Sequence, residues 1–126
     1  MIKQLITTKN APDAIGPYSQ AIRVDNLIFL SGQIGIDPIT KKFAYNDIRR
    51  QTEQIFENLK AVLKEAGASL ENIVKTTLFL KNIADFSIIN ELYTEYLKKP
   101  FPARSVVVVK ELPLSVDIEI EAIAVL

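Results

Sequence analysis

The chain contains no cysteine and no histidine among its 126 residues. Without cysteine it has no disulfide, no thiolate nucleophile and no thiolate metal site. Without histidine it lacks the side chain that most often acts as a general base near neutral pH and as a transition-metal ligand. Serine triads, zinc hydrolase centres and histidine-dependent ribonuclease chemistry are therefore excluded. Any catalysis has to depend on carboxylates, Arg, Lys, Tyr, hydroxyls, backbone groups and water.

An excess of charge is also missing, because 15 Lys and Arg balance 15 Asp and Glu. Proteins that bind nucleic acids or acidic membrane surfaces usually carry a basic excess on one face, so neither partner is expected, although a local basic patch is compatible with zero net charge. No apolar run is long enough to span a bilayer, and the N-terminal residues do not have the pattern of a secretory signal. We therefore expect a cytoplasmic protein with one domain over residues 1–126.

The hydrophobic pattern predicts an α+β fold. The clearest helix covers residues 47–66, with Asn46 as its N-cap and Gly67 as the left-handed residue that follows it. A second amphipathic helix is expected over residues 85–97. Strands are expected over 2–6, 21–24, 27–31, 73–80, 103–109 and 116–125, with a hairpin turn at residues 25–26.

Two helices cover about one face of a sheet of about six strands, and each apolar face of a layered fold has to be buried. The strand 105–109, SVVVV, places valines on both faces, because successive side chains point in opposite directions. The face without helices is therefore expected to pack against another subunit. This inference indicates an oligomer without fixing the number of subunits.

Arg104 begins an apolar strand, where its charge is costly unless it is paired. Its planar fork of donors suits a carboxylate, so it is a candidate for binding an acidic substrate, and a structural ion pair is the alternative. Glu119 and Glu121 share one face of the last strand, either as ordinary exposed residues or, if that face is buried, as proton carriers with raised pKa values. The pattern does not choose between the two carboxylates.

Two further segments contain candidate site residues. Tyr18, in a loop rich in proline and glycine, is either a loop anchor or part of a site. Ser31 and Gly32 end a strand, where glycine permits close approach of a ligand or marks a bulge. The aromatic residues of the helices fit an ordinary core.

Five short segments of the chain together resemble one known protein family. In order along the chain they are AIGPYSQ (14–20), SGQ (31–33), VKTT (74–77), PARS (102–105) and IEIEA (118–122). The family that they resemble is the RidA/YjgF family. The resemblance implies a chorismate-mutase-like α+β fold with a mixed sheet, helices on one face, and a homotrimer with sites between subunits. It also implies hydrolysis of 2-iminopropanoate and 2-iminobutanoate to keto acids and ammonia, without a cofactor or metal. Such hydrolysis protects pyridoxal-phosphate enzymes from these imines and their enamine tautomers.

By the same resemblance, Arg104 binds the substrate carboxylate and Glu119 positions or activates the attacking water. Tyr18, Ser31, Gly32 and Asn90 are expected to line the pocket. Many family members have cysteine where this chain has Val106, a difference that leaves imine hydrolysis unaffected. Two alternatives stay open: an endoribonuclease or translation inhibitor, and a non-catalytic trimer that binds small carboxylates or acts as a chaperone.

Overall fold

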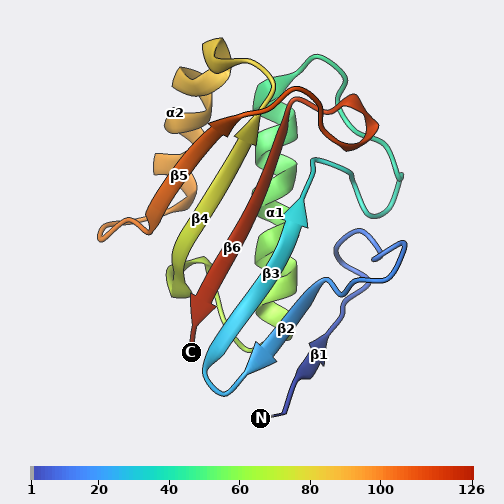
Figure 1. Cartoon of the computed structure of the whole chain (residues 1–126), viewed down its shortest axis with the longest axis vertical. Coiled ribbons are helices and arrows are strands. Elements are labelled where there is room, and N and C mark those ends of the chain that lie inside the picture. Colours follow the sequence, from blue (N-terminus) through green and yellow to red (C-terminus); the bar gives the residue numbers. More distant parts are fainter. Residues whose placement is uncertain (1) are drawn as a thin grey trace.

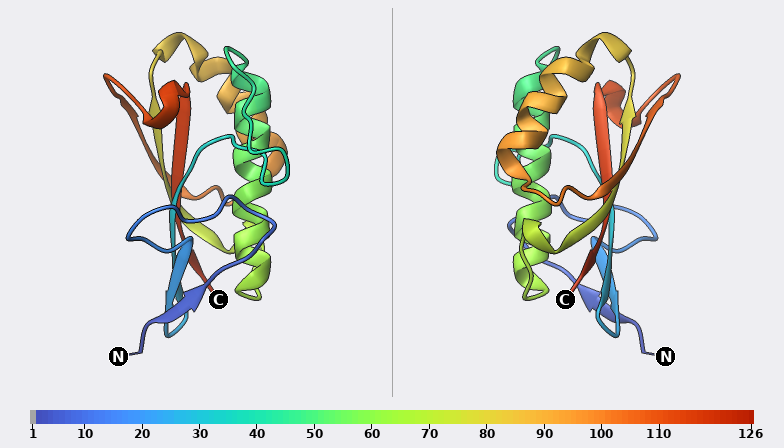
Figure 2. Two further views of the ribbon diagram at one scale, coloured as in Figure 1. Left: turned by 90° about the vertical axis from the view of Figure 1, so that its right-hand side faces the viewer. Right: turned by 90° about the vertical axis from the view of Figure 1, so that its left-hand side faces the viewer.

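The computed structural model describes residues 2–126 and forms two layers, a six-stranded sheet and a pair of helices (Figure 1). Both helices lie on the same side of the sheet (Figure 2), as expected from the sequence. The α-helices are α1 (Ile48–Glu65) and α2 (Phe86–Tyr96). The strands are β1 (Gln4–Ile6), β2 (Ala21–Val24), β3 (Leu27–Gln33), β4 (Ile73–Leu80), β5 (Ala103–Val108) and β6 (Ile118–Val125).

The sheet has the strand order β1-β2-β3-β6-β4-β5. Strands β4 and β5 run parallel, because α2 carries the chain back across the sheet between them, whereas the other neighbouring pairs are antiparallel. The expected mixed α+β sheet is thus confirmed. Its order places β6, the last strand, in the interior of the sheet, and β5 at an edge.

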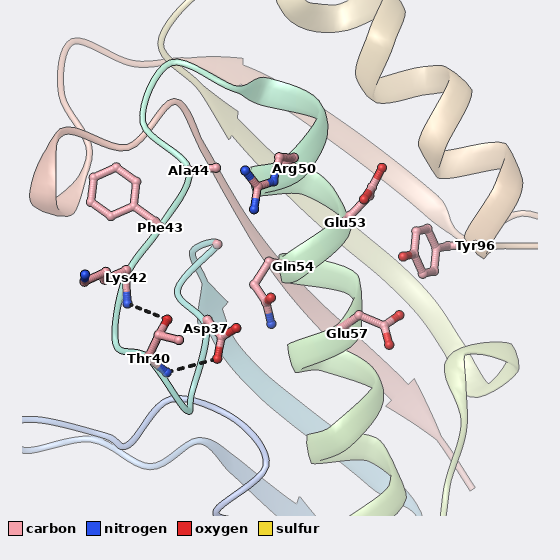
Figure 3. A pocket seen from close by; sticks show the side chains of 11 residues that line it. Asp37, Thr40, Lys42, Phe43, Ala44, Arg50, Glu53, Gln54, Glu57 and Tyr96 are labelled. Carbon is pink, nitrogen blue, oxygen red and sulfur yellow. Dashed lines mark hydrogen bonds between the residues drawn. The ribbon is translucent and has the colours of Figure 1, made fainter.

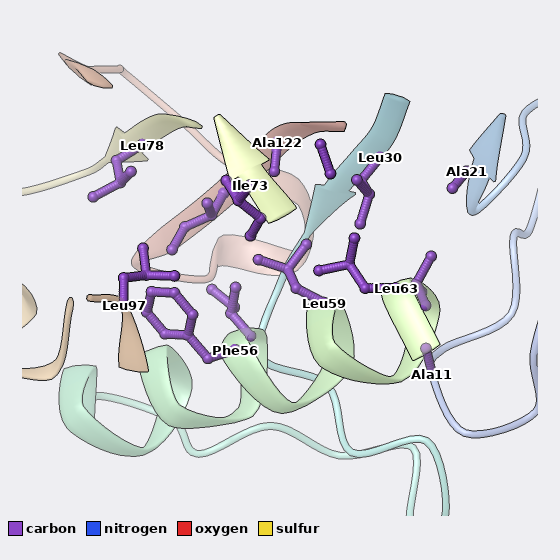
Figure 4. Close-up of a cluster of buried hydrophobic side chains, with 14 of the residues drawn as sticks. Ala11, Ala21, Leu30, Phe56, Leu59, Leu63, Ile73, Leu78, Leu97 and Ala122 are labelled. Atoms are coloured by element: carbon purple, nitrogen blue, oxygen red, sulfur yellow. The ribbon is translucent and has the colours of Figure 1, made fainter. Parts of the chain in front are cut away.

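The core lies between the helices and the sheet (Figure 4). Helix α1 buries one apolar stripe, and the alternate residues of β6 face it. The fully or almost fully buried members of these two sets are Ile55, Phe56, Leu59, Val62, Leu63, Ile118, Ile120, Ala122 and Ala124. Side chains three or four residues apart share one face of a helix, and side chains two residues apart share one face of a strand. These spacings explain why the listed side chains of α1 and β6 meet.

The capping residues show one correction. Asp47, rather than Asn46, is the N-cap of α1, since its side chain accepts a hydrogen bond from the Arg50 backbone N–H at 3.1 Å. Asn46 instead has a left-handed backbone with φ 55°. Asparagine adopts that conformation readily, so the residue before the cap turns the chain into the helix. Gly67 has φ 77° and follows the helix as expected.

The opposite face of the sheet is called here the open face, because no α-helix of residues 2–126 lies over it. Residues Leu27, Phe29 and Val107 lie on this face and are each between 38% and 43% exposed. Val106 points the other way and packs against the core, so the valines of β5 do lie on both faces. Within residues 2–126, no helix has the length and apolar character of a bilayer-spanning segment.

Candidate functional site

Arg104 is the second residue of β5, and its side chain lies on the helix side of the sheet. Its Nη1 donates a hydrogen bond to Asn90 Oδ1 of α2 at 2.8 Å. Its Cζ lies over two aromatic rings of the same helix, 5.2 Å from the Phe86 centroid and 4.8 Å from the Tyr93 centroid. Within residues 2–126, Arg104 makes no salt bridge with an aspartate or glutamate. Its charge is therefore available to an acidic ligand.

A pocket of about 430 Å³ lies beside this guanidinium. It is called here the Arg104 pocket, and the residues that line it are Asn90, Tyr93, Thr94, Phe101, Pro102 and Arg104. A cationic group next to apolar and aromatic walls suits a small organic acid, whose carboxylate pairs with the fork of donors while its carbon skeleton contacts the walls.

Glu119 lies on the open face, where its side chain covers Gly32. The register of β3 and β6 shifts between Leu30 and Gln33, which is the bulge that the SGQ segment suggested. A Cβ atom added to Gly32 would collide with the Glu119 carboxyl group, so the absence of a side chain is what makes room for that group. The bulge and the glycine together fix the position of the carboxylate.

Burial raises the pKa of Glu119 above its usual value, and the neighbouring Glu121 carboxylate raises it further. Both glutamates alternate with buried residues of β6 and lie on the same face, as the sequence predicted. A carboxylate with a raised pKa is a better proton acceptor near neutral pH than an exposed glutamate. This property is consistent with general-base chemistry at Glu119.

The loop that contains Tyr18 is fastened to the bulge. Ser31 Oγ donates a hydrogen bond to the Ser19 backbone carbonyl at 2.5 Å, and the Ser31 N–H donates to the Gln20 carbonyl at 3.0 Å. Tyr18 itself is 54% exposed. Figure 2 shows part of the loop between β1 and β2 projecting on the open side of the sheet. In this chain Tyr18 is therefore available for contact with another molecule.

The structure thus divides the sequence-predicted residues into two groups. Arg104 and Asn90 lie together on the helix side of the sheet, at its β5 edge. Glu119 and Gly32 lie on the open face, with the Tyr18 loop attached next to them through Ser31. A single chain does not bring the two groups together.

A larger pocket of about 570 Å³ lies elsewhere, between the 35–47 loop and the outer side of α1 (Figure 3). Its charged lining residues are Asp37, Lys42, Arg50, Glu53 and Glu57. None of the residues predicted for the site lines it. Within residues 2–126, no three Asp or Glu side chains gather in a way that suits a metal ion.

The sequence interpretation missed Phe86 and Tyr93, which contact Arg104. They stand seven residues apart on α2, with Asn90 four residues after the first, so all three lie on one stripe of the helix. The sequence signal for them was present, but the same spacing is typical of core residues. Only the position of β5 beside α2 shows that this stripe faces an arginine.

Comparisons with known proteins agree with this fold. Residues 8–126 match the family model described as Endoribonuclease L-PSP. The chain is 53% identical over 124 residues to a RutC family protein of Pyrococcus abyssi, covering 98% of both proteins. It is 45% identical over 125 residues to the 2-iminobutanoate/2-iminopropanoate deaminase of Homo sapiens, covering 99% of this chain and 91% of the human protein.

Among solved structures, a protein of the Rid family from Yersinia pestis superposes with a TM-score of 0.96 at 49% identity, covering 99% of this chain and 100% of that one. The agreement in sequence extends over almost the whole chain, and the agreement in structure includes both helices and the sheet. The chain therefore belongs to the RidA/YjgF/RutC family, as the resemblance of its five sequence blocks implied.

Proposed function

We propose that this chain catalyses the hydrolytic deamination of small 2-imino acids, such as 2-iminopropanoate and 2-iminobutanoate, to 2-keto acids and ammonia. The observation that carries the proposal is the environment of Arg104. Its guanidinium is held by a neutral amide and two aromatic rings, without a carboxylate from residues 2–126, beside a pocket of a size that suits a small acid. The name of the human relative supports the same reaction.

In the proposed reaction, Arg104 binds the substrate carboxylate in bidentate fashion. A water molecule attacks the electrophilic carbon of the protonated imine, and Glu119 accepts a proton from that water. The resulting tetrahedral carbinolamine receives the proton on its nitrogen. The carbon–nitrogen bond then breaks and ammonia leaves, while the Glu119 carboxylate accepts the hydroxyl proton, so that the oxygen remains on carbon as a carbonyl. Glu119 then passes this proton to the ammonia, which departs as ammonium, and returns to its ionised form. One water is consumed for each imine, and the enzyme contributes mainly by positioning the two reactants.

We further propose that the site forms between subunits of a homotrimer, with Arg104 and Asn90 from one copy and Glu119, Gly32 and Tyr18 from its neighbour. Two features support this arrangement: the separation of the two groups in one chain, and the apolar residues of the open face that no helix covers. The proposal keeps the cytoplasmic setting expected from the sequence. Under this proposal, the biological role of the protein is the removal of imines that damage pyridoxal-phosphate enzymes.

The description of the family model favours one alternative, an endoribonuclease. The balance of 15 basic and 15 acidic residues and the absence of histidine make efficient RNA cleavage a poorer fit to this chain. Incubation with labelled single-stranded RNA at two salt concentrations tests this alternative directly. Salt-sensitive binding with cleavage would favour it over imine hydrolysis.

The proposed function is tested by a coupled assay in which a threonine dehydratase supplies the imine and semicarbazide traps it. The wild-type protein should suppress trapping, and Arg104→Ala should lose that effect. Arg50→Ala is the matched control, because Arg50 is an exposed arginine that lines the α1 pocket rather than the Arg104 pocket. No suppression by the wild-type protein with either imine would contradict the proposal. Equal activity of the two arginine variants would contradict the role of Arg104.

A further inference from the structure

We propose that Phe86 and Tyr93 are positioning residues that hold the Arg104 guanidinium in one orientation for the substrate carboxylate. This inference rests on the proposed function, and it extends that function to two side chains that the sequence blocks of the family resemblance do not include. Both rings come from the stripe of α2 that also presents Asn90. Three side chains of one helix therefore converge on one arginine of the adjacent edge strand.

The contacts restrict the guanidinium in different directions. Asn90 Oδ1 accepts a hydrogen bond from Nη1 and so acts in the plane of the group. The Phe86 and Tyr93 rings lie within 5.2 Å and 4.8 Å of Cζ, the range of attractive cation–π contacts. A guanidinium has five N–H donors, so the hydrogen bond to Asn90 leaves donors free for a bidentate carboxylate.

The Tyr93 ring is itself fixed in relation to Arg104. Its hydroxyl shares a buried hydrogen bond of 2.8 Å with Thr76 Oγ1. Thr76 is the register partner of Arg104 on the neighbouring strand β4. The ring is thus tied at one end to the strand next to the arginine and at the other end to α2. A buried tyrosine hydroxyl needs a hydrogen-bond partner, and here that partner is the residue paired with Arg104, so the bond holds the ring in place over the guanidinium.

The neighbouring aromatic residues offer a comparison on the same helix. Tyr96 stacks on Phe56, with ring centroids 4.7 Å apart, and no cation of residues 2–126 lies over its ring. Phe86 and Tyr93 differ from it because each contributes a ring face to Arg104. The difference matters for function, since an arginine that is already ordered loses less side-chain entropy when a carboxylate binds.

The inference is tested with Phe86→Leu and Tyr93→Leu, which remove one ring each, and with Tyr96→Leu as the matched control. Binding of 2-oxobutanoate, the keto-acid product, is measured by calorimetry, and KM and kcat are measured with the imine. Loss of one cation–π contact should weaken 2-oxobutanoate binding and raise KM by roughly 2- to 30-fold, with a smaller change in kcat. Tyr96→Leu should bind 2-oxobutanoate like the wild-type protein.

A second measurement reports on the arginine without substrate. In ¹⁵N NMR spectra of the wild-type protein, a held guanidinium gives separate, slowly exchanging Nη signals. The two leucine variants should average these signals by faster rotation, and Tyr93→Phe, which keeps the ring but loses the hydrogen bond to Thr76, should give an intermediate result. If the leucine variants do not fold, the wild-type spectrum and Tyr93→Phe decide the question.

The outcomes separate the inference from the proposed function. A wild-type protein that neither binds 2-oxobutanoate nor hydrolyses imines would contradict the proposed function, and this inference would be overturned with it. A wild-type protein that does both, while Phe86→Leu and Tyr93→Leu match Tyr96→Leu, would overturn the inference alone. A freely rotating Arg104 guanidinium in the active wild-type protein would also overturn the inference without contradicting the proposed function.

Discussion

Arg104 and Glu119 project from opposite faces of one sheet, from the two strands that flank β4. Arg104 is paired in register with Thr76 and Glu119 with Phe79, three residues farther along β4. Three residues of strand correspond to roughly 10 Å, and the thickness of the sheet adds to this separation. The two side chains of one chain therefore cannot contact the same small imino acid, and an active site that uses both requires two copies of the chain.

Mixed oligomers test this requirement. Arg104→Ala and Glu119→Gln should each be inactive alone. When the two variants are unfolded and refolded together, about a quarter of the wild-type activity should return. With random mixing, about a quarter of the interfaces combine the intact Arg104 of a Glu119→Gln subunit with the intact Glu119 of an Arg104→Ala subunit. The imine-trapping assay measures the recovery. Continued inactivity of the mixture, with oligomers of normal size by light scattering, would show that both residues act within one chain.

Gly32 is expected to be required for activity more than for stability. In Gly32→Ala, the flexible end of Glu119 has to move away from the new methyl group, so the free energy of unfolding should fall by only about 1 kcal/mol. The displaced carboxylate should nevertheless lower kcat/KM by roughly 10- to 100-fold.

Gly67→Ala is the matched control for this variant. It places alanine at a left-handed position, which costs about 1 kcal/mol of stability, but among residues 2–126 no atom beyond the two chain neighbours of Gly67 lies within 4 Å of the added methyl group. It should therefore keep full activity. Denaturant titrations and kinetics of both variants make the comparison. Similar kinetics for the two would mean that Gly32 does not position Glu119.

The sequence predicted the two layers well, because local patterns determine them. The helical stripe predicted over 47–66 and the strand predicted over 116–125 correspond to α1 and β6, and the shared face of Glu119 and Glu121 followed from the alternation within that strand. The surroundings of Arg104 were not predictable in this way. They depend on β5 lying beside β4 and under α2, a long-range arrangement that no local period encodes. Phe86 and Tyr93 therefore resembled ordinary core residues.

Asn90 is expected to matter because it is neutral. In Asn90→Asp, the introduced carboxylate would accept the same hydrogen bond from Arg104 Nη1 and would also compensate the charge of the guanidinium. A charged partner at this position should weaken 2-oxobutanoate binding by about tenfold or more. Thr94→Asp is the control, since Thr94 lines the same pocket without bonding to Arg104. A smaller loss of 2-oxobutanoate affinity in Asn90→Asp than in Thr94→Asp would contradict this role of Asn90.

The pH dependence of the reaction should report on Glu119. Burial raises the pKa of Glu119, and the negative charge of Glu121 raises it further, so the base becomes protonated at a higher pH than an exposed glutamate would. Glu121→Gln removes the second cause and lowers the pKa of Glu119. The acid limb of kcat/KM, which follows ionisations of the free enzyme, should therefore move to lower pH in this variant. The rate above the limb should change little, because Glu119 is already ionised there.

A matched substitution excludes a general effect of charge. Glu65→Gln removes one negative charge from the exposed C-terminal end of α1, on the helix side of the sheet and thus across the sheet from Glu119, and should leave the acid limb in place (Figure 2). Stability gives an independent measure of the same titration. Because the pKa of Glu119 is raised in the folded state, the wild-type protein should lose stability as the pH rises through that pKa. Glu119→Gln should remove this loss, so that its unfolding free energy changes less over the same pH interval. An acid limb that moves to higher pH in Glu121→Gln would mean that the titrating group is not a carboxylate repelled by Glu121.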